Sequence, residues 1–174
     1  MSNSIIVPET DIFIATVGFL LQRGVIPYHF SIPKGKGIDT KSLKKKLEDG
    51  SKALGINPSF IRDGADMIAL SEKEWWHIEC KGSGGGKPQT QTAKFHIVLS
   101  SVVSHYGEDK SILPERCRSA DQYLGLSIPE TKQYLNELNR RVKRPLRQRL
   151  NLWVLLYDIS TRTIRAIEPN QEYK

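Results

Sequence analysis

The chain has 174 residues, of which 39% are apolar and 26% charged, and we expect residues 1–174 to form a single globular domain. No apolar run is long enough to cross a bilayer, and the N-terminus lacks the basic flank of a secretory signal. These features predict a cytoplasmic protein with no membrane partner. The net charge of +7 favours polyanionic partners, of which nucleic acid is the commonest.

The first third of the chain predicts two helices with a strand between them. Apolar residues recur at helical spacing from Glu9 to Arg23, and Gly24 is a plausible stop. Residues 25–33 are short, apolar and aromatic, which suits a strand. A basic, glycine-rich loop at 34–37 precedes a helix that is expected to run from about residue 40 to residue 54.

The rest of the chain alternates strand-like and helical segments. Two strand-like runs, 66–70 and 75–81, flank four polar residues and predict a β-hairpin. A helix is expected over 88–106, an irregular or weakly helical stretch over 107–127, and a helix from Ile128 that Pro145 interrupts. Strands at 152–157 and 163–167 complete a mixed α/β layer architecture.

The predicted hairpin brings two carboxylates together. With residues 71–74 as the turn, Leu70 faces Trp75, and counting back along both strands places Asp66 opposite Glu79. Side chains alternate along a strand, so His77, Glu79 and Lys81 share a face that is expected to line a site or meet solvent. The other face, formed by Trp76, Ile78 and Cys80, is apolar and should be buried.

This pairing predicts metal chemistry. Two carboxylates so close together repel unless a cation lies between them, and Mg²⁺ prefers oxygen ligands of this kind. The ammonium group of Lys81 could orient an attacking water or stabilise charge on a phosphate. The set suits metal-assisted hydrolysis of phosphodiesters. His77 is expected to be structural or to face the substrate rather than to bind the metal.

Asp66 followed by Glu79-Cys80-Lys81 resembles the D…(D/E)xK motif of the PD-(D/E)xK, or restriction-endonuclease-like, nuclease superfamily. Ala65 stands where many members have proline. The predicted order of elements matches the family core over roughly residues 9–168. The resemblance implies an α/β fold with a restriction-endonuclease-like core, that is, a central mixed β-sheet flanked by helices.

The resemblance also implies roles for individual residues. Asp66, Glu79 and the backbone carbonyl of Cys80 would bind Mg²⁺, with Mn²⁺ as a substitute, and Lys81 would be catalytic. Many members add an acid from the first helix, for which Glu9 is the best-placed candidate and Asp11 the alternative. Some members place a glutamine early in the helix after the lysine, and both Gln89 and Gln91 are available.

Two basic stretches could contact phosphates. One contains Lys34, Lys36, Lys41, Lys44, Lys45 and Lys46, and the other contains Arg140, Arg141, Lys143, Arg144, Arg147 and Arg149. The alternative is that both are solvated helix faces. The candidates for nucleic-acid binding are Lys87, Arg140, Arg141, Lys143 and Arg144.

The leading hypothesis is therefore a Mg²⁺-dependent deoxyribonuclease, with DNA favoured over RNA. One alternative is a nucleic-acid-binding or assembly subunit of the same fold that does not cleave. Another is a metal-dependent hydrolase of small phosphate esters, which the long basic stretches disfavour. Cleavage of both strands of a duplex would require a homodimer or a partner subunit, because one such site cuts one strand at a time.

Overall fold

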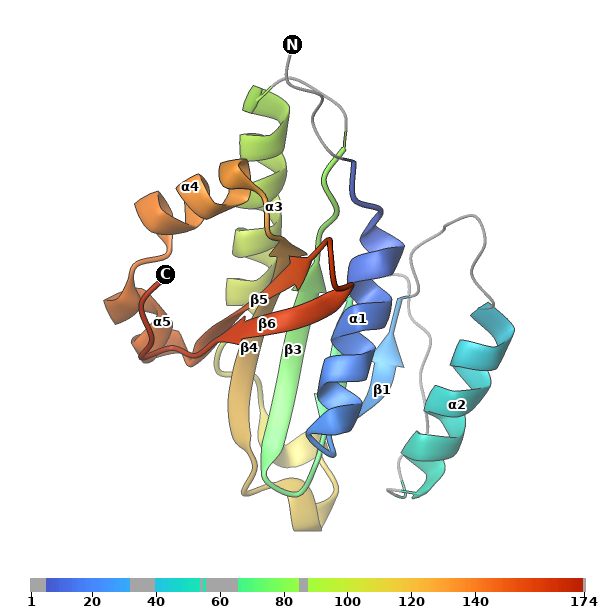
Figure 1. Cartoon of the computed structure of the whole chain (residues 1–174). Helices are drawn as coiled ribbons and strands as arrows, with labels where there is room; N and C mark the ends of the chain where they lie inside the picture. The colour runs from blue at the N-terminus through green and yellow to red at the C-terminus, as the bar shows by residue number, and fades with distance from the viewer. Residues whose placement is uncertain (1–5, 32–39, 54, 56–65, 85–87, 174) are drawn as a thin grey trace.

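The computed structural model describes residues 6–31, 40–53, 55, 66–84 and 88–173 (Figure 1). The loop expected at 34–37 and the candidate Lys87 lie outside this range. In chain order the elements are α1 (Glu9–Gln22), β1 (Ile26–Phe30), α2 (Thr40–Ala53), β2 (Met67–Leu70), β3 (Glu74–Cys80), α3 (Pro88–Ser104), two short 3-10 turns (Lys110–Ile112 and Glu115–Cys117), β4 (Asp121–Pro129), α4 (Lys132–Arg141), α5 (Arg144–Leu150), β5 (Leu152–Asp158) and β6 (Thr163–Ile167).

The described strands form one open, mixed sheet of six, in the spatial order β1-β2-β3-β4-β5-β6. The pairs β3/β4 and β4/β5 are parallel, whereas β1/β2, β2/β3 and β5/β6 are antiparallel. Parallel neighbours need a crossover connection. The segment containing α3 makes the crossover from β3 to β4, and α4 with α5 make the one from β4 to β5. The expected α/β fold with a central mixed sheet flanked by helices is confirmed.

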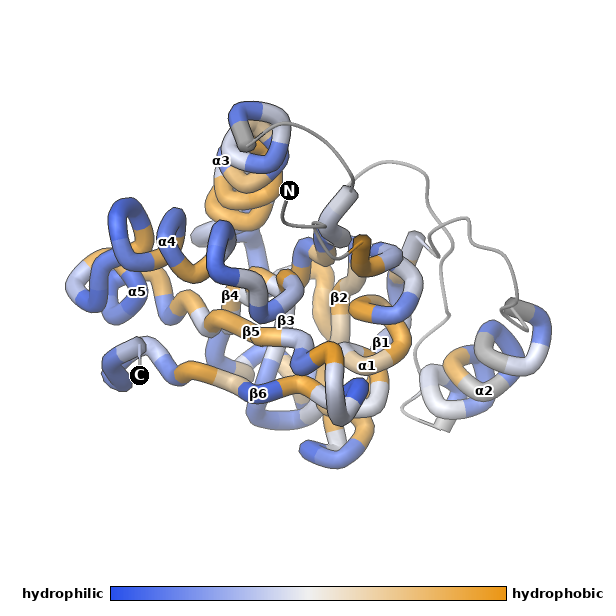
Figure 2. The backbone as a smooth tube through the Cα atoms, turned by 45° about the horizontal axis from the view of Figure 1, so that its top comes forward, coloured by the Kyte–Doolittle hydropathy of each residue, from blue (hydrophilic) through white to orange (hydrophobic). Residues whose placement is uncertain are grey.

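Helices cover both faces of the sheet (Figures 1 and 2). On one face α1 packs its apolar residues against the inward side chains of β2, β3 and β5. On the other face α3 and α4 pack against β4 and β5. The helix α2 contacts the edge strand β1. Within the described residues, no helix is both long and apolar enough to cross a membrane.

The predicted hairpin register is confirmed. Leu70 pairs with Trp75 and Met67 pairs with Ile78, so the continuation of the ladder places Asp66 opposite Glu79. The helix α1 also ends as expected, with Gly24 in the left-handed conformation at φ +72°.

The expectation for residues 107–145 was wrong in two respects. Residues 121–129 form β4, a central strand, rather than an irregular stretch followed by the start of a helix at Ile128. The next helix begins only at Lys132, with Thr131 as its N-cap, and ends at Arg141 before Pro145. Pro145 then lies in the first turn of a separate helix, α5, where a proline is tolerated because the first turn lacks intrahelical partners for its N–H groups.

A glycine explains why β4 was hard to recognise. Gly125 lies beside Ile78 in the β3/β4 ladder, and a Cβ at Gly125 would come within 2.8 Å of Ile78 Cγ1. Glycine usually weakens a strand, but here it makes room for a large neighbour in the core.

Candidate functional site

The predicted site residues lie where the carboxyl end of β3 meets the start of α1. Lys81 N–H donates to the carbonyl of Ser127 at 2.9 Å, which extends the parallel pairing of β3 and β4 by one residue. Val7 N–H donates to the carbonyl and to the hydroxyl of Ser83, both at 3.0 Å. These bonds fix the first residue of α1 beside the chain that leaves β3. Ligand sites of open α/β sheets commonly lie at this end of the parallel strands.

Gly82 permits this close approach. A Cβ at Gly82 would come within 2.5 Å of the Val7 carbonyl oxygen and 2.7 Å of the Glu9 nitrogen. The absence of a side chain therefore lets α1 start directly against the loop. As a result Glu9 Oε2 lies 2.8 Å from Lys81 Nζ, and the two side chains are about one-third exposed. Of the two acids proposed in the first helix, the structure brings Glu9 to this site, whereas Asp11 lines a separate pocket with Tyr157.

Asp66 is held against β3 by a hydrogen bond. Its Oδ2 accepts from the backbone N–H of Cys80 at 2.9 Å. The pKa of Asp66 is raised to about 7, first because burial disfavours the charged form and then because Glu79 and Glu9 add negative charge nearby. The hydrogen bond from Cys80 and the charge of Lys81 oppose this rise. Asp66, Glu79, Glu9 and Lys81 are thus within electrostatic range of one another.

Glu79 is more enclosed than the sequence indicates. The residue is 7% exposed, and Trp75 and His77 on the same face of β3 are 1% and 0% exposed. This face was expected to line a site or to meet solvent. His77 and Glu79 do not meet solvent, and beside them Trp75 packs against Leu113, Cys117 and Ala120 of the chain after α3. The opposite face, with Trp76, Ile78 and Cys80, is buried as expected.

Two residues near Glu79 could not be found from the sequence. His105 follows α3, and its Nε2 lies 3.6 Å from Glu79 Oε1, while its Nδ1 lies 2.6 Å from Glu108 Oε1. The pKa of His105 is raised, mainly by the nearby carboxylate of Glu79. His77 stacks on His105 with ring centroids 5.2 Å apart, and burial lowers the pKa of His77 to about 4. No sequence pattern joins residue 79 to residues 105 and 108.

Further side chains brace the loop after β3. Gln91 is 5% exposed and its Nε2 donates to the carbonyl of Gly84, so of the two candidate glutamines it is the one at the site. Gln89 is exposed. The hydroxyl of Tyr134, from α4, donates to the carbonyl of Gly82 at 3.1 Å. Burial raises the pKa of Tyr134 to about 12.

Five of the six residues in the second basic stretch are exposed, and Arg147 is buried. Arg140 is 70% exposed and its Nη1 lies 3.8 Å from Glu137 Oε1. Arg141 donates to Glu137 at 2.7 Å, and Arg144 donates to Glu172 at 3.0 Å. Lys143 donates to the carbonyl of Asn139. Arg147 is fully buried, donates to the carbonyls of Glu168 and Gln171, and lies over the ring of Tyr173. Arg147 is therefore a buried structural residue, and the prediction that it contacts phosphate does not hold.

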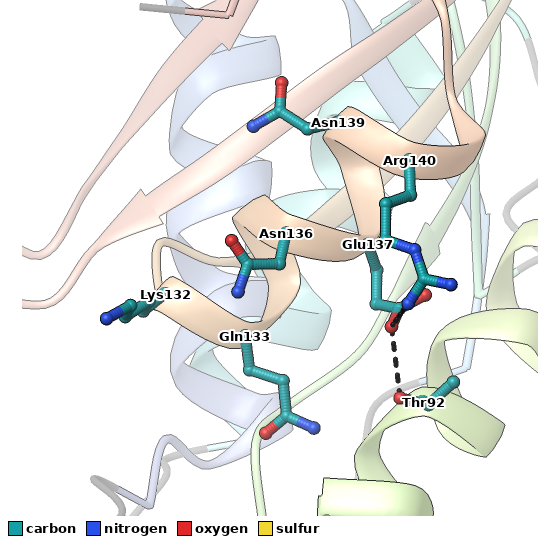
Figure 3. Close-up of a pocket in the computed structure, with 7 residues that line it drawn as sticks. All are labelled: Thr92, Lys132, Gln133, Asn136, Glu137, Asn139 and Arg140. Carbon is teal, nitrogen blue, oxygen red and sulfur yellow. Dashed lines mark hydrogen bonds and ion pairs between the residues drawn. The ribbon is translucent and has the colours of Figure 1, made fainter.

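The exposed part of α4 borders a pocket of about 570 Å³ that is lined by polar and charged residues (Figure 3). Its walls come from α4 and from the start of α3, where Thr92 donates to Glu137 at 3.2 Å. The lining residues are Thr92, Lys132, Gln133, Asn136, Glu137, Asn139 and Arg140. The same helix carries Tyr134, whose hydroxyl bonds to Gly82, so α4 connects the pocket to the loop that follows Lys81.

Comparisons with family models, with curated proteins and with solved structures find no match to this chain.

Proposed function

We propose that this protein is a metal-dependent nuclease with a restriction-endonuclease-like core that hydrolyses phosphodiester bonds, with DNA favoured over RNA as the substrate. The observation that carries the proposal is the convergence of three carboxylates and one ammonium group from three elements. Glu9 comes from α1, Asp66 precedes β2, and Glu79 and Lys81 come from β3 and its end. The D…(D/E)xK spacing and the helix, strand and hairpin order around it support the same conclusion.

The donors present fit a hard divalent cation. Glu79 Oε1 is buried without a hydrogen-bond partner among the described residues, although His105 Nε2 lies 3.6 Å away. The pKa of Asp66 is raised first by burial and then by the negative charges of Glu79 and Glu9. A bound Mg²⁺ would give the Glu79 oxygen a partner and would stabilise the charged form of Asp66. Its usual protein ligands are oxygen-rich sets with one or two carboxylates. Asp66, Glu79 and the Cys80 carbonyl are the proposed ligands, with Glu9 as an additional acid.

The chemistry follows from what each group can do. The metal, when bound, lowers the pKa of a coordinated water and offsets charge on the phosphate. Lys81 holds an ammonium group at the mouth of the site, one-third exposed, where it can orient the attacking water or stabilise the developing negative charge. Glu9, at 2.8 Å, keeps Lys81 in place when no phosphate is bound. The Cys80 N–H holds the Asp66 carboxylate in position.

A polymeric substrate is supported by the charge and by α4. The exposed cations Lys132 and Arg140 border the polar pocket, together with amide side chains that can bond phosphate and sugar oxygens. Arg140, Arg141, Lys143 and Arg144 remain the proposed phosphate contacts, and all four are exposed. Arg140 is more exposed than Arg141 and Arg144. Lys87 stays a candidate from the sequence.

The test is a cleavage assay with labelled single- and double-stranded DNA and RNA, in Mg²⁺, in Mn²⁺ and in EDTA. We expect metal-dependent cleavage that falls about 10²–10³-fold in Lys81→Ala and further in Asp66→Ala and Glu79→Gln. Glu72→Gln and Lys73→Ala are the matched controls, because they remove the same charges from the exposed turn of the same hairpin.

Cleavage that survives EDTA, or that is unchanged in all three site variants, would overturn the proposal. Binding that weakens as salt rises, without any cleavage, would instead favour a nucleic-acid-binding or assembly subunit. Cleavage of small phosphate esters alone would favour the third hypothesis.

A further inference from the structure

A second cluster of metal-ligating side chains lies beside Glu79. His77 from β3 and His105 and Glu108 from the turn after α3 each offer one donor atom, and these atoms all lie within 4.8 Å of one another. His77 Nδ1 and His105 Nδ1 are 3.8 and 2.6 Å from Glu108 Oε1. The donors come from two parts of the chain separated by the whole of α3. The cluster is therefore a product of the fold and not of local sequence.

His77 is the residue that the packing leaves unexplained. It is 0% exposed, and neither ring nitrogen has a hydrogen-bond partner among the described residues. A buried polar group without a partner costs free energy, typically about 1–3 kcal/mol. A neutral imidazole in that position offers a lone pair, which is the form that binds metals. Glu108, the carboxylate that its Nδ1 approaches, is only one-third exposed.

His105 has the arrangement of a metal-binding histidine. Its Nδ1 points to the cluster, and its Nε2 lies 3.6 Å from Glu79 Oε1. Histidines that bind a metal through one nitrogen commonly donate the other N–H to a carboxylate, which fixes the ring orientation and tautomer. Glu79 is in the position to be that carboxylate.

We propose that His77, His105 and Glu108 bind one divalent transition-metal ion of the zinc class, distinct from the Mg²⁺ proposed between the carboxylates. Two imidazoles with one carboxylate suit Zn²⁺, Co²⁺ or Ni²⁺, whereas Mg²⁺ prefers oxygen ligands. Donors around a tetrahedral Zn²⁺ lie roughly 3.3 Å apart. The 2.6 Å contact between His105 Nδ1 and Glu108 Oε1 therefore has to open by about 0.7 Å, whereas the wider separations, which reach at most 4.8 Å, have to close by at most about 1.5 Å. The partly exposed Glu108 side chain can supply these movements.

Such an ion would connect the turn after α3 to strand β3 of the sheet. It would fix His105, and through His105 it would hold the enclosed carboxylate of Glu79. Three protein ligands leave a position for water or for a fourth ligand. The proposal does not depend on nuclease activity, since it concerns binding of an ion by residues outside the D…(D/E)xK motif.

A metal-free explanation makes a different prediction. A protonated His105 could pair with both Glu79 and Glu108 and give the same contacts without an ion. In that case the cluster would bind no Zn²⁺, and His77 would remain without a partner.

The experiment is a calorimetric titration of the chelator-treated full chain with Zn²⁺, carried out in the Asp66→Ala background to remove binding at the carboxylate site. We expect one ion per chain, with an affinity that falls at least about 100-fold in His105→Ala and in Glu108→Gln. His96→Ala is the matched control, because His96 is exposed on α3 outside the cluster. X-ray absorption at the zinc edge should show two imidazole ligands.

Folding is monitored in the same samples. Zn²⁺ should raise the Tm of the Asp66→Ala and His96→Ala proteins but not that of His105→Ala, whose Tm without metal should stay close to the parent value. Zinc binding that persists in His105→Ala and Glu108→Gln, or the absence of binding in the Asp66→Ala protein, would overturn the proposal.

Discussion

Replacing Asp66 by asparagine should remove a pH-dependent loss of stability in the metal-free protein. The pKa of Asp66 is raised from 3.8 to about 7 by burial and by the charges of Glu79 and Glu9. The native state therefore holds a proton that the unfolded chain releases between these two values. The contribution to stability is fully present below about pH 3.8 and is lost as the pH rises through about 7.

The magnitude follows from the two pKa values. The interval from 3.8 to about 7 corresponds to about 4 kcal/mol at 1.36 kcal/mol for each pH unit. Because Asp66 is only partly buried, solvent screening reduces this figure, and we expect about 2 kcal/mol. Asparagine keeps an oxygen that can accept the hydrogen bond of the Cys80 N–H, so the comparison isolates the charge.

The assay is urea unfolding in EDTA from about pH 4.5 to about pH 8, with the difference in unfolding free energy between wild type and Asp66→Asn as the measured quantity. As the pH rises, the wild type should lose about 2 kcal/mol of unfolding free energy relative to Asp66→Asn. Asp49→Asn, on the exposed side of α2, should follow the wild type. Added Mg²⁺ should raise the unfolding free energy of the wild type near pH 8 but should not raise that of Asp66→Asn. Parallel curves for wild type and Asp66→Asn would refute the reasoning.

Three further substitutions separate packing from substrate binding. Gly82→Ala should lower the free energy of unfolding by about 1–3 kcal/mol, because its Cβ would overlap backbone atoms of Val7 and Glu9. Gly18→Ala, whose Cβ would have no atom within 4 Å, should not lower it, and equal losses in the two variants would contradict this reasoning. Arg147→Met should lower the free energy of unfolding by about 2–4 kcal/mol, because it leaves two backbone carbonyls unpaired. In the same urea assay, Arg149→Met, at an exposed position, should change the free energy of unfolding by less than about 0.5 kcal/mol. Arg140→Ala should leave stability unchanged but reduce the slope of log affinity for DNA against log salt by about 1, and an unchanged slope would remove this residue from the interface.

The sequence by itself determined the local geometry of the candidate site. The four-residue turn and the alternation of side chains were sufficient to set the register of β2 and β3, because a hairpin with a defined turn leaves one pairing that buries the apolar face. The same register places Asp66 opposite Glu79, so the pairing of the two carboxylates is a local property of the hairpin. The end of α1 just before Gly24 was also predictable, because only a few neighbouring residues decide it.

Only the tertiary structure decided which distant residues join that hairpin. The choice of Glu9 over Asp11 depends on the approach that Gly82 allows, and the proximity of His105 to Glu79 depends on the return of the chain after α3. The strand β4 was not predicted because Gly125 interrupts the local β pattern, although this glycine fits beside Ile78 in the core. Such contacts are set by the order of strands in the sheet and by the space between packed side chains. Neither of these is encoded within a short stretch of sequence.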